Sequence, residues 1–180
     1  MNTRVISALI VVALVAVGLV AFLSSRKDHT GENSTAQKIQ WHSYNEGVAL
    51  ARTQNKKVLI DVYTDWCGWC KKMDSDVYSD ESINKIVAGH FIAVKLNAES
   101  SNSVTVGTDQ LNEASLARAM GATGYPTTVF LDSEAGPITR VAGYMEAKQF
   151  AAVLKFIGED HYKSTTFEQF RASTAAASKN

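Results

Sequence analysis

The stretch "VLIDVYTDWCGWCKKM", residues 58–73, decides the fold, and it contains both cysteines of the chain, Cys67 and Cys70. Its first half is an almost continuous apolar run rich in β-branched residues, which is typical of a strand covered on both faces. A single acid, Asp61, interrupts the run. The residues after the cysteines have helical spacing, so we expect the two thiols at a strand-to-helix junction.

Strand and helix patterns alternate on both sides of this stretch. The helix after the cysteines is expected to break near Tyr78 and to restart behind a cap at Ser79 or Asp80. Strands are expected near 39–41 and at 57–63, 91–96, 127–132 and 138–143, helices at 44–56 (behind a Ser43 cap), 71–90, 110–120 and 146–158, and a loop at 97–109. This order predicts an α/β fold with a central mixed sheet flanked by helices.

The chain begins with an apolar segment, Val5 to Leu23, which is 19 residues long and contains no charge. A helix of this length rises about 28 Å, close to the hydrocarbon thickness of a bilayer, and it is longer than the apolar part of a cleaved signal peptide. We expect an N-terminal transmembrane signal-anchor at 1–23, a flexible linker at 24–36, a globular domain at 37–160 and a C-terminal extension at 161–180, with a short helix and a disordered end.

Charge argues against one class of partner and leaves the orientation of the apolar segment open. The chain has 18 basic and 18 acidic residues and no basic stripe interleaved with aromatic residues, so we expect no nucleic-acid partner. Arg4 on one side of the segment nearly balances Arg26 and Lys27 on the other. A very short tail before an apolar run is typical of secretory signal-anchors. We therefore expect a single-pass protein of the inner membrane with its globular domain in the periplasm.

Three kinds of chemistry compete for two cysteines at this spacing. A zinc site needs four ligands, and the nearest histidines, His42 and His90, are distant in sequence, so we expect no metal. A purely structural disulfide contributes only about 2 kcal/mol when it closes so short a loop. A redox pair makes use of the spacing itself. We expect a solvated face and a helix cap, not a metal site, from the acids Asp74, Asp76, Asp80 and Glu81.

The redox interpretation gives the two thiols different tasks. At the start of a helix, Cys67 meets unpaired backbone amides and the positive end of the helix dipole, which stabilise a thiolate. Cys70 lies one turn inward on the same face and can attack a mixed disulfide held on Cys67. We therefore expect Cys67 to attack a substrate and Cys70 to release it.

Two separate motifs resemble the thioredoxin superfamily. The first stretch shares with the active site of that family the strand, Asp61 six residues before the first cysteine, and Trp66 directly before it. The second motif, "GATGYPTTVFLD" at 121–132, is similar to the segment in which a cis-proline, here Pro126, faces the cysteines. The resemblance covers about 39–158, and it implies a thioredoxin fold for the globular domain.

The resemblance also implies roles for single residues. Asp61 would be buried and would accept the proton of Cys70, and Lys95, in "AVKLNAE", matches the lysine near this acid. The position of Trp69 at the helix start, independently of the resemblance, predicts that it is partly exposed and contacts a partner polypeptide. The residues expected to support the active site or the substrate groove are Trp66, Gly68, Trp69, Lys95, Tyr125, Pro126 and Gly143. Three alternatives stay open: a hydrogen-bonded core acid for Asp61, core packing for Trp66 and a simple strand-end turn for Gly143.

Gly68-Trp69 stands where thioredoxin has Gly-Pro, which changes the stabilisation of the Cys67 thiolate. "CGWCKKM" behind an anchor resembles the periplasmic thioredoxin-like branch, which includes the C-terminal domain of DsbD-type reductases and SoxW-like proteins. That branch implies a thiol:disulfide oxidoreductase that reduces disulfides of extracytoplasmic proteins. It also implies a transmembrane thiol electron donor of the DsbD or CcdA type, and no cofactor besides the redox-active disulfide Cys67-Cys70. Net oxidation or isomerisation, and a non-catalytic binding or chaperone module, stay open.

Overall fold

The computed structural model describes residues 38–177 of the 180-residue chain. The predicted anchor at 1–23 and the predicted linker at 24–36 lie outside the described residues. Between residues 38 and 177, no helix is long and apolar enough to cross a membrane.

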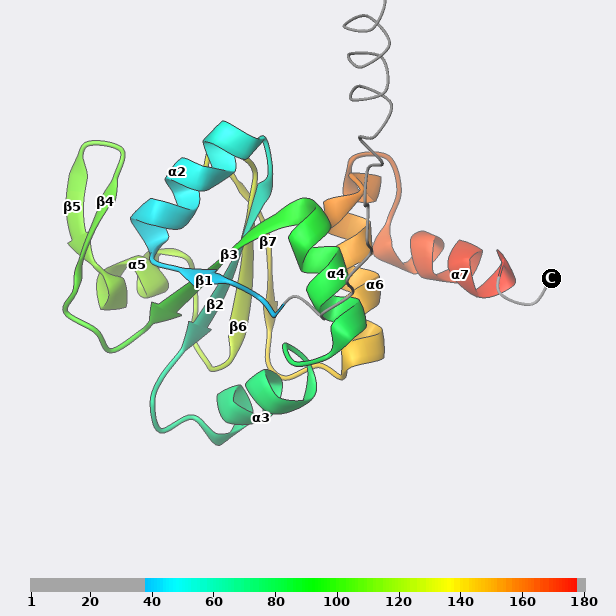
Figure 1. Cartoon of the computed structure of the whole chain (residues 1–180), viewed down its shortest axis with the longest axis horizontal. Coiled ribbons are helices and arrows are strands. Elements are labelled where there is room, and N and C mark those ends of the chain that lie inside the picture. Colours follow the sequence, from blue (N-terminus) through cyan, green and yellow to red (C-terminus); the bar gives the residue numbers. More distant parts are fainter. Residues whose placement is uncertain (1–37, 178–180) are drawn as a thin grey trace, which may run out of the picture. The chain divides into compact units, whose positions relative to one another are not determined.

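A five-stranded sheet forms the centre of the described domain (Figure 1). In spatial order its strands are β1 (Trp41–His42), β3 (Phe91–Asn97), β2 (Lys57–Tyr63), β6 (Thr127–Leu131) and β7 (Pro137–Ala142). The first three are parallel, whereas β6 runs antiparallel to β2 and β7 antiparallel to β6. The helices are α2 (Tyr44–Gln54), α3 (Gly68–Asp76), α4 (Glu81–His90), α5 (Glu113–Ala119), α6 (Ala147–Gly158), the 3-10 helix η1 (His161–Lys163) and α7 (Phe167–Ala177). The predicted mixed sheet flanked by helices is confirmed.

Strand β2 supplies core residues to both faces of the sheet. Val58, Ile60 and Val62 pack in a cluster with residues of α2 and α5, whereas Leu59 packs in a second cluster with residues of α3, α4 and α6. Because side chains alternate along a strand, Asp61 lies on the face of Leu59. The single acid of this strand is therefore buried on the side of the sheet that carries the helix with the cysteines.

The break between α3 and α4 lies where the sequence predicts it. Asp80 occupies the N-cap of α4, and its carboxylate accepts hydrogen bonds from the backbone amides of Ser82 (2.8 Å) and Ile83 (3.2 Å). Tyr78 lies in the link between the two helices, with its side chain in the core. Ser43 takes the N-cap position of α2, but its side chain makes no capping hydrogen bond.

The loop predicted at 97–109 is wrong in part, because this segment contains one strand of a β-hairpin and the start of the other (Figure 1). Strands β4 (Ser103–Val106) and β5 (Asp109–Asn112) pair antiparallel around a two-residue turn. Gly107 begins the turn with φ of +61°, a conformation that favours glycine. Val104 and Val106 alternate with polar residues, but this pattern is too short to distinguish a strand from a loop.

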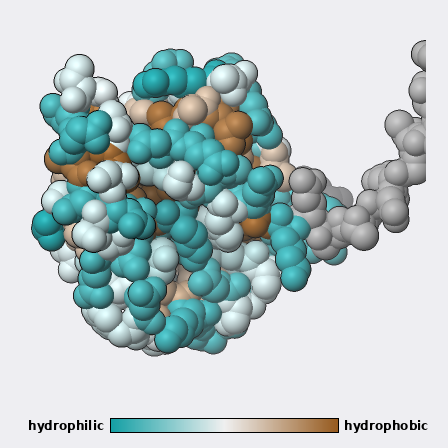
Figure 2. Space-filling model, turned by 60° about the vertical axis from the view of Figure 1, so that its left-hand side comes forward, coloured by the Kyte–Doolittle hydropathy of each residue, from teal (hydrophilic) through white to brown (hydrophobic). Residues whose placement is uncertain are grey.

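The helix predicted at 110–120 is shorter than expected for the same reason. Residues 110–112 belong to β5, and α5 begins only at Glu113. The Asn112 side chain accepts a hydrogen bond from the Ser115 amide (2.8 Å) and so caps the helix. Figure 2 brings the hairpin side of the molecule forward and shows hydrophobic patches there between hydrophilic residues.

The described part of the predicted extension, residues 161–177, packs against α6, and residues 178–180 lie outside the described residues. The rings of Phe167 and Phe170 on α7 lie 5.3 Å and 5.5 Å from the ring of Phe156 on α6. The imidazole of His161 lies 4.6 Å from the ring of Phe170. These aromatic contacts attach η1 and α7 to the rest of the domain.

A close approach between α2 and β3 yields a stability prediction. A Cβ atom added at Gly47 would lie 2.2 Å from Cγ2 of Val94, whereas one added at Gly89 on α4 would meet no atom within 4 Å. We expect Gly47→Ala to lower the free energy of unfolding by about 1–3 kcal/mol because it overpacks the core. Gly89→Ala is the matched control and should raise the free energy of unfolding by about 0.4–1 kcal/mol. Urea denaturation checks both values, and equal stability of the two variants would contradict the packing of α2.

Candidate active site

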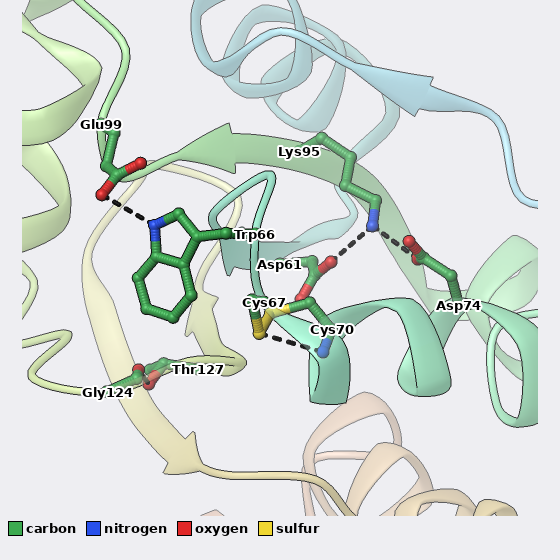
Figure 3. The surroundings of a disulfide bond; sticks show 9 residues. All are labelled: Asp61, Trp66, Cys67, Cys70, Asp74, Lys95, Glu99, Gly124 and Thr127. Atoms are coloured by element: carbon green, nitrogen blue, oxygen red, sulfur yellow. Dashed lines mark hydrogen bonds and ion pairs between the residues drawn. A yellow bond between two sulfur atoms is a disulfide. The ribbon is translucent and has the colours of Figure 1, made fainter.

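The two cysteines form a disulfide at the start of α3 (Figure 3). Cys67 is the N-cap residue of α3, and Cys70 is the third residue of the helix. The Cys70 amide donates a hydrogen bond to Cys67 Sγ (3.0 Å), and the Cys67 amide donates to the carbonyl oxygen of Thr64 (3.2 Å). Gly68, the first helical residue, has open space where a side chain would begin. The pair thus lies at the strand-to-helix junction that the sequence predicts.

Position on the helix, and not exposure, distinguishes the two thiols. Cys67 is 4 % exposed and Cys70 is 2 % exposed. Cys67 Sγ stands in the place of a capping group, where the amides of the first turn favour a negative charge. Cys70 lies one turn inward. The arrangement can therefore stabilise Cys67 as a thiolate and keep Cys70 within reach of its sulfur.

The loop before β6 brings the second motif to the disulfide. The peptide bond before Pro126 is cis. Gly143, at φ +85°, donates its amide to the Pro126 carbonyl (2.8 Å), which ties this loop to the end of β7. The Thr127 hydroxyl donates to the Gly124 carbonyl (2.7 Å), and Figure 3 shows both residues in the surroundings of the disulfide. The two motifs of the sequence therefore meet at one site.

Each cysteine directly follows a tryptophan whose indole ring is exposed. Trp66 and Trp69 are 67 % and 58 % exposed, and they are the exposed large hydrophobic side chains of the described domain. Trp66 Nε1 donates to Glu99 Oε1 (2.9 Å; Figure 3), and its ring lies edge-on to Tyr125. The Trp69 ring lies 5.3 Å from the ring of Tyr144. Exposed aromatic surface of this kind is suited to contact a polypeptide. Glu99 and Tyr144 lie outside both motifs, and no signal in the sequence identified them.

Near the disulfide, one lysine bridges two carboxylates (Figure 3). Lys95 Nζ lies 2.6 Å from Asp61 Oδ2 and 2.6 Å from Asp74 Oδ1. The parallel register of β2 and β3 sets Asp61 directly beside Lys95, so the lysine lies next to the buried acid as the resemblance implies. The Asp61 side chain has no exposed surface, whereas that of Asp74 is half exposed.

Asp74 differs from the expectation of a purely solvated acidic face. It lies on α3 one turn after Cys70, which brings its carboxylate to Lys95. Helical spacing from Cys70 could have predicted that Asp74 lies on the helix face of this cysteine, but not that it contacts Lys95. Its neighbour Asp76 pairs with Lys72 on the surface, in agreement with the prediction. Within residues 38–177, no three His, Cys, Asp or Glu side chains come together as a possible metal site.

Burial and charge shift the pKa values of Asp61 and Lys95. Burial raises the pKa of Asp61 above its ordinary value of 3.8, and the attraction of Lys95 opposes this rise without cancelling it. Burial lowers the pKa of Lys95, but the carboxylates of Asp61 and Asp74 more than offset this, so the net change is upward. Asp61 Oδ1 has no hydrogen-bond partner. A buried carboxyl with a raised pKa and a free oxygen is suited to accept a proton.

Similar proteins are known over the same region. A family of thioredoxin-like domains matches residues 44–158. The thiol:disulfide interchange protein DsbD of Yersinia pestis (strain Pestoides F) is 34% identical over 103 residues, which are 56% of this chain and 16% of that protein. The protein of the same name from Escherichia coli O6:K15:H31 (strain 536) is 28% identical over 153 residues, 80% of this chain and 26% of that protein. The chain thus spans about a quarter or less of the length of these relatives.

Solved structures show the same fold. A thioredoxin from Thermus thermophilus has a TM-score of 0.55 at 24% identity, with 67% of this chain and 88% of that chain covered. A thioredoxin-fold protein from Helicobacter pylori has a TM-score of 0.54 at 24% identity, with 69% and 82% covered. The family match extends over more than half of the sequence, and the fold agrees with it. The chain therefore belongs to the family of thioredoxin-like domains.

Proposed function

We propose that this protein is a thiol:disulfide oxidoreductase that reduces disulfides of other proteins outside the cytoplasm. The observation that carries the proposal is the Cys67–Cys70 disulfide at the start of α3, in the neighbourhood of a buried acid (Figure 3). A helix start can stabilise the attacking thiolate, and a buried carboxylate can activate the second thiol. The DsbD relatives, which are named thiol:disulfide interchange proteins, support the same class of reaction.

In the proposed reaction, the reduced protein transfers two electrons to a substrate disulfide. The Cys67 thiolate attacks one substrate sulfur, which forms a mixed disulfide and releases the other substrate sulfur as a thiolate. Asp61 takes the proton of Cys70, and the Cys70 thiolate attacks Cys67 Sγ. This step forms the Cys67–Cys70 disulfide and expels the second substrate thiolate. The substrate is reduced to a dithiol, and the protein is left oxidised.

The oxidised protein needs a source of electrons. We propose a transmembrane thiol carrier of the DsbD or CcdA type, with no dissociable cofactor, and membrane attachment through residues 1–23. The support for this route is the apolar Val5 to Leu23 segment and the similarity to DsbD proteins. The substrate is a disulfide-containing protein, and the exposed rings of Trp66 and Trp69 offer it a contact surface.

Two other functions use the same fold. Net oxidation or isomerisation of substrate disulfides needs the same two cysteines and differs in the reduction potential. A non-catalytic binding or chaperone module needs neither thiol, so the paired cysteines and the buried Asp61 argue against it.

The roles of the two thiols can be separated by trapping. In the full chain, Cys70→Ser should accumulate covalent adducts with substrate proteins on non-reducing gels, because Cys67 still attacks but the adduct is not released. Cys67→Ser is the matched control and should give none. The adducts should sediment with membranes and contain periplasmic partners. Equal trapping by both variants would contradict the assigned roles, and adducts with cytoplasmic proteins alone would contradict the proposed location.

The direction of the reaction depends on the reduction potential. Lys71 and Lys72 follow the pair, but Lys72 is engaged by Asp76, and Asp65 and Asp74 carry the opposite charge, so the local charge nearly cancels. We therefore expect a potential of about −200 to −270 mV, on the reducing side of the range that ends near about −120 mV for strong oxidants. Equilibration with glutathione buffers, followed by alkylation and mass measurement, gives the value. A potential more positive than about −150 mV would identify a dithiol oxidase instead.

The proton-acceptor role of Asp61 has a kinetic and a thermodynamic consequence. Asp61→Asn should slow release of the mixed disulfide by about 100-fold near neutral pH. Because the folded pKa of Asp61 is raised, wild-type stability is reduced as the pH rises from 3.8 through that folded pKa. The substituted side chain carries no charge, so the variant does not lose this stability. At pH 7 the Tm of the variant should be no lower than that of the wild type, and any difference in Tm in its favour should vanish near pH 4. An unchanged release rate between pH 6 and 9 would leave Asp61 with a structural role only.

A further inference from the structure

The ammonium group of Lys95 is surrounded by aromatic rings as well as by carboxylates. Its Nζ lies 4.7 Å from the ring centroid of Trp41, 5.1 Å from that of Tyr63 and 5.5 Å from that of Tyr78. The same nitrogen binds Asp61 Oδ2 at 2.6 Å. The ring of Tyr78 therefore reaches the buried space in which the Asp61 carboxyl lies.

The hydroxyl group of Tyr78 is close enough to interact with the Asp61 carboxyl, and its hydrogen bond to Thr128 is long. Its Oη lies 3.5 Å from Thr128 Oγ1, which is longer than a normal bond between two hydroxyl groups. Thr128 on β6 is the residue paired with Asp61 across the sheet, so both side chains lie on the same face. Asp61 Oδ1 has no hydrogen-bond partner. A buried donor without a good acceptor and a buried acceptor without a donor thus share one small region.

We propose that Tyr78 is a positioning residue for the proton transfer from Cys70, a role that rests on the proposed function of Asp61. When Asp61 is ionised, the Tyr78 hydroxyl donates to Oδ1 of the carboxylate. When Asp61 has taken the proton, the hydroxyl turns back to Thr128 Oγ1. The tyrosine thereby sets the pH at which Asp61 is ready to accept a proton, although it does not touch the substrate.

The charges around Asp61 determine the sign of this effect. Lys95 from β3 and the Tyr78 hydroxyl from the α3–α4 link favour the ionised carboxyl, and Asp74 from α3 disfavours it. Cys70 on α3 supplies the proton, and Tyr63 on β2 faces the Lys95 ammonium with its ring. Removal of the Tyr78 hydroxyl takes away a donor to the ionised form. Asp61 should then stay protonated up to a higher pH.

The test measures the two thiol steps separately with an aromatic disulfide. When the reduced full chain reacts with 5,5′-dithiobis(2-nitrobenzoate), attack by Cys67 releases one thionitrobenzoate, and attack by Cys70 on the mixed disulfide releases the second. The second release is followed by stopped-flow absorbance between pH 5 and 9. We expect Tyr78→Phe to shift the midpoint of this pH profile upward by about one pH unit. Below the midpoint the second step is then about tenfold slower, and the first step keeps its rate.

Tyr63→Phe is the matched control, because it also removes a hydroxyl from a ring that faces Lys95. It should leave the midpoint in place. An unchanged midpoint in Tyr78→Phe, or an equal shift in both variants, overturns the proposal and leaves the role of Asp61 intact. A second step that Asp61→Asn does not alter overturns the proton-acceptor role together with this inference. Failure to release either thionitrobenzoate counts against the proposed oxidoreductase itself.

A second variant acts in the opposite direction and covers the case in which Tyr78→Phe does not fold. Thr128→Val removes the alternative acceptor of the Tyr78 hydroxyl and leaves the tyrosine in place. The hydroxyl should then bind Asp61 more fully and shift the midpoint downward. Carbon-13 NMR of the Asp61 carboxyl in the oxidised protein measures the protonation of this group directly as the pH changes. A midpoint that stays in place or rises in Thr128→Val contradicts the proposal.

Discussion

An ionised carboxyl in the middle of a β-sheet is unfavourable, and the arrangement of this site follows from how Asp61 is accommodated. Burial of such a charge costs several kcal/mol unless a partner of opposite charge and hydrogen bonds compensate. The parallel register of β2 and β3 supplies that partner by placing Lys95 beside Asp61. Lys95 also binds Asp74 on α3, so a continuous line of charges joins the sheet to the helix that carries the cysteines. The position of α3 over the sheet and the ionisation of Asp61 are therefore coupled.

The same coupling leaves part of the Asp61 carboxyl free for chemistry. Lys95 holds Oδ2, whereas Oδ1 has no hydrogen-bond partner. If partners compensated the whole cost of burying the charge, the carboxylate would be stable and therefore a weak base. Without any compensation, the carboxyl would stay protonated at all working pH values. A single lysine, shared with Asp74, gives an intermediate result, and the pKa of Asp61 stays raised. The Cys67–Cys70 disulfide therefore lies near a buried carboxyl whose Oδ1 has no hydrogen-bond partner (Figure 3).

The local patterns of the sequence were enough to predict the strand before the cysteines, the helix break at Tyr78 and the mixed sheet. They succeeded because apolar runs, caps and helical spacing depend on neighbours along the chain. The contacts of Asp74 and Tyr144 depend instead on residues far apart in sequence, and no local pattern reports them. The β4–β5 hairpin was missed for a third reason. Its alternating residues are too few, and its polar residues resemble those of a loop.

The charges placed around α3 bear on the direction of electron flow. Lys72 pairs with Asp76, and Lys95 is held by two carboxylates, so neither cation is free to pair with a thiolate at Cys67. Stabilisation of that thiolate is then left mainly to the backbone amides at the start of the helix. A strongly oxidising pair requires a much more stable thiolate than a helix start alone provides. The charges around α3 therefore add little to the stabilisation of the Cys67 thiolate, which depends mainly on the local backbone at the start of the helix.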